Sequence, residues 1–239
     1  LAGRGLIATV PDAAILSHAD PLDGNGDGIS GVVRLVNGKI GRFGWKADHA
    51  SLQEQVATAF AMDIGLSSKH SPAQFADCTD QQRECRNNPD GNDELGDGFE
   101  ISETVIDLVS RYVASLGTER AGSATGLVLF EKTGCAACHL PTIRGINGPV
   151  GLFSDLLIHD MGTGLSDGFA QAGILASEWR TAPLIGISTS KSRLLHDGRA
   201  ETVRDSIHWH GGEALKSKDS FLALSAEDQH VLLDFVGGL

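Results

Sequence analysis

The sequence predicts a mainly α-helical protein with long loops. Several segments carry apolar residues at the spacing of one helix face, and no stretch alternates apolar and polar residues for long. The stretches between them are rich in Gly, Asp and other turn-forming residues. The chain has 239 residues, 41% hydrophobic and 21% charged, which suffices for one large or two small domains with a buried core.

The first expected helix follows a long irregular start. Residues 1–45 are rich in Gly and Asp and are expected to form loops and turns. Residues 48–62, "DHASLQEQVATAFAM", are expected to be helical because Ser51 and Glu54 have the spacing of a capping box and an apolar stripe follows. Residues 67–98 are polar and turn-rich, which is typical of a surface connection.

Three further helices are expected beyond this connection. Residues 103–117 place their apolar residues on one side, and a glycine ends the segment. Residues 124–134 form a short helix that leads the chain into a pair of cysteines. Residues 225–239 begin with Ser225 and Asp228 at capping-box spacing, with Asp where Glu or Gln is usual.

Residues 41–60 and 192–211 share one pattern. Each has an aromatic residue or His before a turn, then an N-capping residue, an acid three residues later, and a helix with an apolar face. Thr202 stands 151 residues after Ser51, and Asp205 the same distance after Glu54. Two related halves would explain the match, and chance similarity between two capped helices is the alternative.

The charge balance restricts the partners. A net charge of −12 argues against nucleic acid and anionic membrane surfaces, and favours a cationic or neutral partner. The chain lacks the roughly 18-residue apolar run of a membrane span and opens without a signal peptide. Because it also begins without Met, we expect a mature or cut product.

The segment "EKTGCAACHLP", residues 131–141, carries the clearest chemistry. Cys135 and Cys138 are followed directly by His139. Zinc would need a second pair of ligands, and Cys78 and Cys85 are too widely spaced to supply it. A redox dithiol would need a βαβ setting that the pattern does not show. The motif therefore favours one covalent haem c, with both thiols bound to the ring and His139 on the iron.

The second axial position of that iron has several candidates. His208 and His210 would diverge by about 200° on a helix, so only one of the two can face a haem. Met161 is a rival, because His/Met ligation is common. The full set of candidates is His159, Met161, His196, His208 and His210.

Five segments together resemble the bacterial di-haem oxidoreductases, also described as thiol oxidoreductases or peroxidases, which are related to di-haem cytochrome c peroxidases. These segments are "GCAACHLP", "SDLLIHDMG", "SEWRTAPLIGI", "LLHDGRAETVRDSIHWHGGEA" and "GRFGWKA". The resemblance covers nearly the whole chain. It implies an exported, periplasmic protein with two mostly helical c-type haem domains, which exchanges electrons with a cytochrome or similar partner.

The resemblance also implies a distal ligand. The matching position is His210, where the peroxidase relatives have Met, so the iron would be bound by His139 and His210, with Met161 as the alternative. The family further implies an inter-haem tryptophan at Trp45 and a catalytic acid near Asp63, which makes both residues candidates for a catalytic role.

The chain departs from the family in having one Cys-x-x-Cys-His motif. We therefore expect it to start inside the first haem domain. Residues 1–70 would be the distal part of that domain, 71–119 a connecting segment with a helix, and 120–239 a cytochrome c-like helical haem domain. The function expected is electron transfer through one six-coordinate haem. The alternative is a peroxidase whose first haem comes from a second chain.

Several residues are expected around the haem. Arg180 and Arg199 are candidate propionate partners because Arg forms paired hydrogen bonds with carboxylates, and surface ion pairs are the alternative. His196 is a candidate hydrogen-bond donor to the haem or an ordinary buried His. Trp179 is expected to pack in the haem pocket.

Two sites are expected away from the haem. Asp20, Asp23, Asn25 and Asp27 resemble part of a calcium loop, although Arg34 stands where a complete EF-hand needs Glu, and an Asp/Gly-rich turn without metal is the competing interpretation. Cys78 and Cys85 are expected to form a disulfide in an oxidising periplasm.

Overall fold

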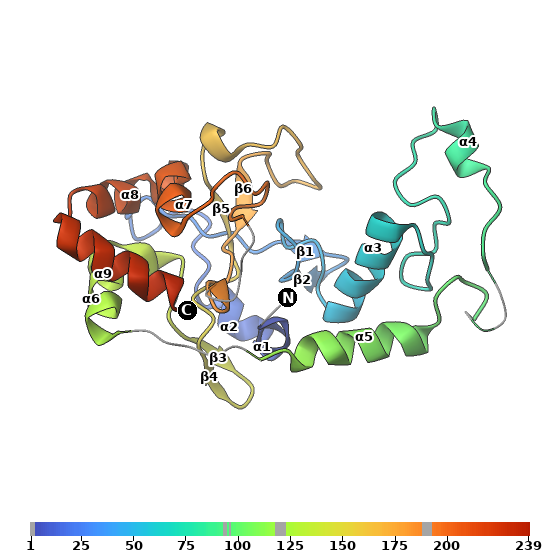
Figure 1. The fold of residues 1–239 in the computed structure, drawn as a ribbon, viewed down its shortest axis with the longest axis horizontal. Coiled ribbons are helices and arrows are strands. Elements are labelled where there is room, and N and C mark those ends of the chain that lie inside the picture. The colour runs from blue at the N-terminus through green and yellow to red at the C-terminus, as the bar shows by residue number, and fades with distance from the viewer. Residues whose placement is uncertain (1–2, 93–94, 96, 118–122, 188–192) are drawn as a thin grey trace.

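The computed structural model describes residues 3–92, 95, 97–117, 123–187 and 193–239. Within these ranges the chain forms nine α-helices and three two-stranded antiparallel sheets (Figure 1). The expected helices and long loops are present, but the fold is mixed rather than plainly helical, because 38% of the structure is helical and small sheets accompany the helices. The strands are two or three residues long, too short to give an alternating pattern in the sequence.

The N-terminal region is more ordered than its composition predicts. It forms two short helices, α1 (Arg4–Ala8) and α2 (Asp12–Leu16), where only loops were expected. Their apolar residues Ile7 and Ile15 are almost completely buried, so tertiary packing holds helices too short to be stable alone. A two-stranded sheet follows, formed by β1 (Leu35–Val36) and β2 (Lys39–Ile40).

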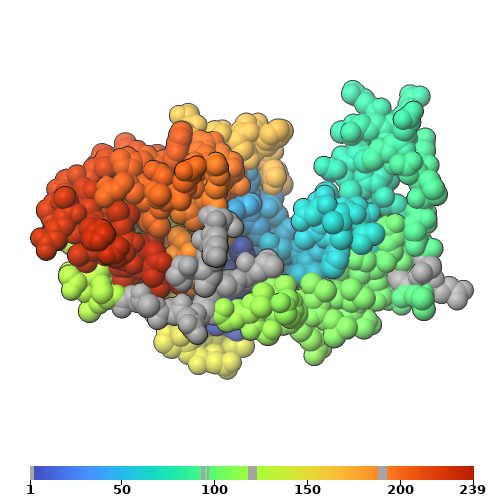
Figure 2. Space-filling model, viewed as in Figure 1, coloured from blue at the N-terminus to red at the C-terminus, as the bar shows by residue number. Residues whose placement is uncertain are grey.

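Two long helices form one end of the molecule. α3 (Leu52–Ile64) begins with the predicted capping box of Ser51 and Glu54, and Gly65 ends it in a left-handed conformation. α5 (Glu103–Ser115) packs against α3. Between them the chain forms an arm within residues 67–101, described at 67–92, 95 and 97–101, which contains α4 (Arg83–Arg86) and projects beyond both helices (Figures 1 and 2).

The other end of the molecule contains four helices (Figure 1). They are α6 (Ala124–Lys132), α7 (Val203–Trp209), α8 (Leu215–Leu222) and α9 (Ala226–Gly237). α6 and α9 can pack closely because Gly126 has no side chain. A Cβ at this position would lie 2.3 Å from the Cβ of Phe235. Phe130, Phe153 and Phe235 meet edge to face at 5.7–5.9 Å and fill the core beneath these helices.

Two more sheets lie between these ends. β3 (Ile143–Gly145) pairs with β4 (Gly148–Val150), and β5 (Ile158–Asp160) pairs with β6 (Glu178–Arg180). Val32 bridges to Ile158 and ties the N-terminal region to β5. One apolar core contains buried residues from Ile7 to Leu239.

The expected division into three parts stays a prediction. The boundary at 119 and 120 lies outside the described residues. No helix in the described ranges combines the length and the apolar character needed to cross a membrane.

The two similar sequence segments adopt the same local structure. Phe43 bridges to His49 in an antiparallel pair, and Leu194 bridges to Ala200 in the same way, 151 residues later. Each bridge is followed by a helix with a complete capping box, formed by Ser51 in one case and Thr202 in the other. The bridge, turn and capped helix are below called the first unit (residues 43–64) and the second unit (residues 194–210).

Candidate functional site

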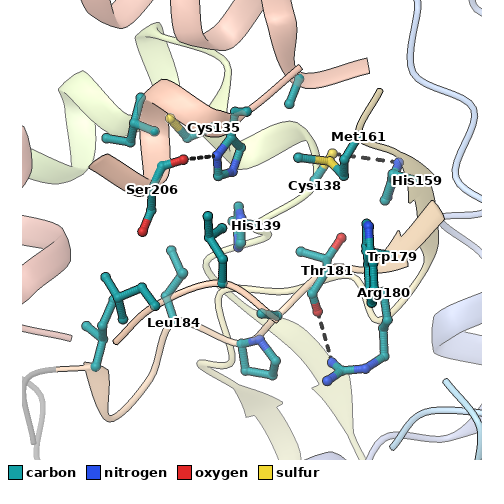
Figure 3. A pocket seen from close by; sticks show the side chains of 18 of the residues that line it. Cys135, Cys138, His139, His159, Met161, Trp179, Arg180, Thr181, Leu184 and Ser206 are labelled. Atoms are coloured by element: carbon teal, nitrogen blue, oxygen red, sulfur yellow. Dashed lines mark hydrogen bonds between the residues drawn. The ribbon is translucent and has the colours of Figure 1, made fainter. Parts of the chain in front are cut away.

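A cavity of about 680 Å³ lies beside the cysteine pair. This volume is within the range of pockets that hold cofactors. Figure 3 shows Cys135, Cys138 and His139 around one space, with Met161 and His159 on the Cys138 side. Strand β6, the loop after it and the end of α7 complete the wall.

The cysteine motif reaches the cavity through a change of backbone direction. α6 ends at Thr133, and Gly134 then adopts φ 85°, a left-handed conformation that glycine allows without strain. Residues Cys135–Ala137 form one 3₁₀ turn, and both thiols are outside any disulfide. Burial raises the pKa of Cys135, so this thiol is protonated at neutral pH.

His139 offers one ring nitrogen to the cavity. Its Nδ1 lies 3.0 Å from the carbonyl oxygen of Phe153, so Nδ1–H donates and Nε2 keeps its lone pair. Burial and the nearby His210 lower the pKa of His139 to about 4. The ring is therefore neutral at physiological pH, which is the form that binds a metal.

His210 repeats this arrangement from another element. It is the C-cap residue of α7, and its Nδ1 lies 2.7 Å from the carbonyl oxygen of Ser206. Burial lowers the pKa of His210 as well, against the opposing effect of this hydrogen bond. His210 lines the cavity, whereas His208 is exposed and does not. The pair His139 and His210 thus presents two neutral imidazoles to one space.

The remaining candidates for the second axial position differ in availability. Met161 lines the cavity, so it remains the alternative ligand. His196 also lines it, but its ring stacks on Trp179 at a centroid distance of 3.7 Å. His159 has both ring nitrogens occupied, by Asp155 at 2.9 Å and Glu213 at 2.8 Å.

The buried network around His159 was not expected from the sequence. Glu213 also accepts hydrogen bonds from the backbone and side chain of Ser30, at 3.1 and 2.6 Å. Burial opposes a charge on His159, but hydrogen bonds to Asp155, Cys138 and Glu213 outweigh it and raise the pKa well above 6.5. The pKa of Glu213 falls to about 2, because hydrogen bonds and the charge on His159 outweigh its burial. The network is therefore a positively charged imidazole held between two carboxylates.

The same network bears on the zinc alternative. Cys138, Asp155 and His159 are the one group within the described ranges whose donor atoms are close enough for a shared metal, all within 4.8 Å. Because Asp155 and Glu213 already bind both nitrogens of His159, this group has no free imidazole nitrogen for a metal. Cys135 does not belong to it.

The other predicted haem neighbours separate into two groups. Trp179 and Arg180 line the cavity, and so does Trp45, whose exposed fraction of 48% places it at the border with solvent. Arg199 is not among the lining residues, since its guanidinium binds Asp197 and the carbonyl oxygen of Gly164. Asp63 is exposed near the end of α3 and does not line the cavity either.

The structure adds Arg4 to the lining. No sequence signal pointed to this residue, because it lies in a region read as loops and outside every motif.

The expected calcium loop has its oxygens otherwise engaged. Asp20 accepts from the backbone N–H of Gly24 at 2.8 Å, and Asp23 from that of Gly28 at 3.2 Å. Asn25 and Asp27 bond to each other at 3.1 Å. These oxygens stabilise the turn itself, and no grouping of three metal-binding side chains occurs here among the described residues, so calcium finds no support.

Cys78 and Cys85 are paired as a disulfide in the arm, with their Cα atoms 6.2 Å apart. Neither lines the cavity. The disulfide therefore cross-links the arm and takes no part in the site.

The cavity residues fit a covalently bound haem. Two thiols flank a neutral imidazole that has Nε2 free, and a second such imidazole belongs to the same wall. No curated protein and no solved structure gives a significant match to the chain. A family model described as "Di-haem oxidoreductase, putative peroxidase" matches residues 1–239, so the chain belongs to this family, and a haem-based redox function follows from the membership.

Proposed function

We propose that this chain is a c-type cytochrome module that transfers electrons through one six-coordinate haem, as part of a periplasmic di-haem oxidoreductase. One observation carries the proposal. His139 and His210 line the cavity of the cysteine pair, and each donates its Nδ1 proton to a backbone carbonyl. Both Nε2 atoms are therefore available for one iron.

Covalent attachment uses the two thiols. Each S–H adds across one vinyl double bond, so that sulfur bonds to one carbon and the hydrogen ends on the other. The thiols of Cys135 and Cys138 start one turn apart, which suits two vinyl groups of one ring. The bound haem supplies one-electron exchange between ferrous and ferric iron.

Ligation by two histidines closes the iron to substrate. A six-coordinate iron has no open position for peroxide, so this site suits electron transfer better than catalysis. Replacing the Met of the relatives by His210 also lowers the expected potential, since Met ligation raises it.

The surface supports a protein redox partner. Trp45 lines the cavity and is 48% exposed, so its indole connects the haem site with solvent. The net charge of −12 favours a cationic partner such as a small cytochrome. The Cys78–Cys85 disulfide suits an oxidising compartment, which supports the periplasmic location.

A second candidate function follows from the motif count. The family name refers to two haems, whereas this sequence contains one Cys-x-x-Cys-His. A peroxidase whose first haem sits on a partner chain would reconcile the two. Native mass spectrometry after gentle purification distinguishes them: a co-purifying haem chain with peroxide turnover favours the peroxidase, and a single-haem chain without turnover favours the electron-transfer module.

The test of the main proposal has two parts. A pyridine haemochrome assay is expected to give one c-type haem per chain, and its absence would refute the proposal. The change His210→Ala is then expected to convert a low-spin absorption spectrum to high spin. His208→Ala, two residues away and exposed, is the matched control and should leave the spectrum unchanged. If Met161→Ala produces the conversion instead, the assigned ligand is wrong.

A further inference from the structure

We infer that Arg4 and Arg180 together form a two-guanidinium site for a propionate of the haem. The inference rests on the proposed function, since it requires haem in the cavity. It adds a binding residue from α1, which precedes the cysteine motif by more than a hundred residues.

Arg180 is held rigidly at the cavity wall. It is the last residue of β6 and only 4% exposed. Its Nε donates to the carbonyl oxygen of Gly44 at 2.9 Å, and Nη1 donates to that of Thr181 at 2.9 Å (Figure 3). An arginine has five N–H donors, so three of them remain for another acceptor. Fixed in this way, the group is pre-organised for a planar carboxylate.

Arg4 approaches the same cavity from α1. It is half-buried and lines the cavity together with Arg180. The two groups lie near enough to repel each other, because the charge of Arg4 is, after burial, the largest cause that lowers the pKa of Arg180 to about 9. Burial lowers the pKa of Arg4 as well. A buried cation beside a half-buried one is costly unless an anion lies between or beside them.

Neither guanidinium is paired with a carboxylate among the described residues. The other Arg and Lys side chains that line the cavity each have a polar partner. Arg193 lies 3.2 Å from Glu201, and the Lys218 ammonium lies 3.5 Å from the carbonyl oxygen of His208. Among the described residues, Arg4 and Arg180 are thus the arginines of this cavity without a carboxylate partner.

A haem carboxylate is the anion that the cavity itself would supply. The propionates are the only acidic groups on the macrocycle, and guanidinium binds carboxylate through paired, charge-assisted hydrogen bonds. Arg199, the other candidate named from the sequence, is neutralised by Asp197 outside the cavity. Arg4 takes the place that Arg199 was expected to fill.

The test measures the midpoint potential of the purified haem protein. Arg4→Gln removes one positive charge near the haem, which disfavours the added electron. At a fixed electrode potential the ratio of oxidised to reduced haem is expected to rise roughly three- to tenfold, and tenfold corresponds to 59 mV for one electron. Arg4→Lys keeps the charge without the planar fork and should recover most of the parent value.

Arg111→Gln is the matched control. This change also removes one positive charge, but Arg111 lies exposed on α5 and pairs with Asp107 at 2.7 Å, away from the cavity lining. The ratio of oxidised to reduced haem in Arg111→Gln is expected to stay at the parent value. Equal ratios in Arg4→Gln and Arg111→Gln would overturn the inference.

A second variant guards against a purely structural effect. Arg180→Gln, which also removes one positive charge, is expected to give a shift in the same direction, and Arg4→Gln with Arg180→Gln should shift less than the two single changes added together. Full additivity would mean that the two residues do not share one propionate. A preparation without covalent haem refutes the proposed function itself, whereas a haem protein with unshifted potentials refutes only the propionate site.

Discussion

The first and second units begin alike and end differently. Both have a bridge across a turn and a capping box, at an offset of 151 residues. The helix of the first unit, α3, runs for 13 residues and ends at Gly65, whereas α7 in the second unit ends after 7 residues at His210. The position that matches His210 in the first unit is Ala59, in the middle of α3. Early termination of the helix thus places His210 in the cavity lining, and the two units differ in the contacts that hold their ends.

The largest effect is expected where the second unit ends. Glu213 follows His210 closely and binds Ser30, His159 and the backbone of Asp160, contacts without a counterpart at Gly65. The change Glu213→Ala leaves the buried charge on His159 with one carboxylate fewer. We expect a loss of about 3–5 kcal/mol in the free energy of unfolding, measured by urea denaturation.

The control for this prediction is Glu201→Ala. Glu201 forms an exposed ion pair with Arg193, so its loss should cost less than about 1 kcal/mol. Equal losses in the two variants would show that the His159 network does not hold the end of the second unit.

Low pH should weaken the contact between Glu213 and His159. The pKa of Glu213 is lowered to about 2 in the folded protein, so its carboxylate stabilises the fold fully above pH 4.5. This contribution, about 3 kcal/mol for such a pKa difference, is lost as the pH falls from 4.5 toward 2. The free energy of unfolding, plotted against pH between pH 6 and pH 2, should therefore fall steeply for the parent and less steeply for Glu213→Gln. Parallel curves would contradict the prediction.

A smaller effect is expected in the turns of the two units. Gly198 has φ 72°, and the matching residue of the first unit, Ala47, has φ 54°. The change Gly198→Ala places a Cβ in a left-handed conformation and 3.3 Å from the Cβ of Arg193, so we expect a loss of about 1–2 kcal/mol in thermal unfolding. Ala47→Gly is the reciprocal control. It relieves the strain but removes a buried methyl group, so its net effect should be close to zero.

The smallest effect separates the units by function. Ser51→Ala and Thr202→Ala each remove one N-capping side chain and should each cost about 1 kcal/mol. Only Thr202→Ala destabilises the short helix that carries His210. Its haem should therefore show a larger high-spin fraction on warming, and an identical spectrum in the two variants would contradict this.

Local signals predicted the parts of the fold that depend on local chemistry. The capping pairs of Ser51 and Thr202 mark the starts of α3 and α7, because their hydrogen bonds lie within four residues. α1 and α2 were missed because five residues give no periodic pattern, and burial of Ile7 and Ile15 in the tertiary core stabilises them. The short strands were missed for the same reason.

The site shows the same division. The cysteine motif and His139 could be recognised because they are adjacent in sequence. His210 came from the family resemblance, and the structure brings it to the cavity of His139. Arg4 and the bond between His159 and Glu213 depend on contacts between distant segments, which a single sequence does not encode in any short pattern.

The arm of residues 67–101 leaves and rejoins the molecule at one point. The N–H of Ile101 donates to the carbonyl oxygen of Ser67 at 3.0 Å, and the Glu100 carboxylate accepts the N–H of Ser67 at 2.8 Å. Because its two ends are in contact, a change in the length of the arm need not alter where the chain leaves and rejoins the rest of the molecule. Evolution could lengthen, shorten or replace it without moving a residue of the haem cavity, and a protein engineer could graft a foreign loop there for the same reason.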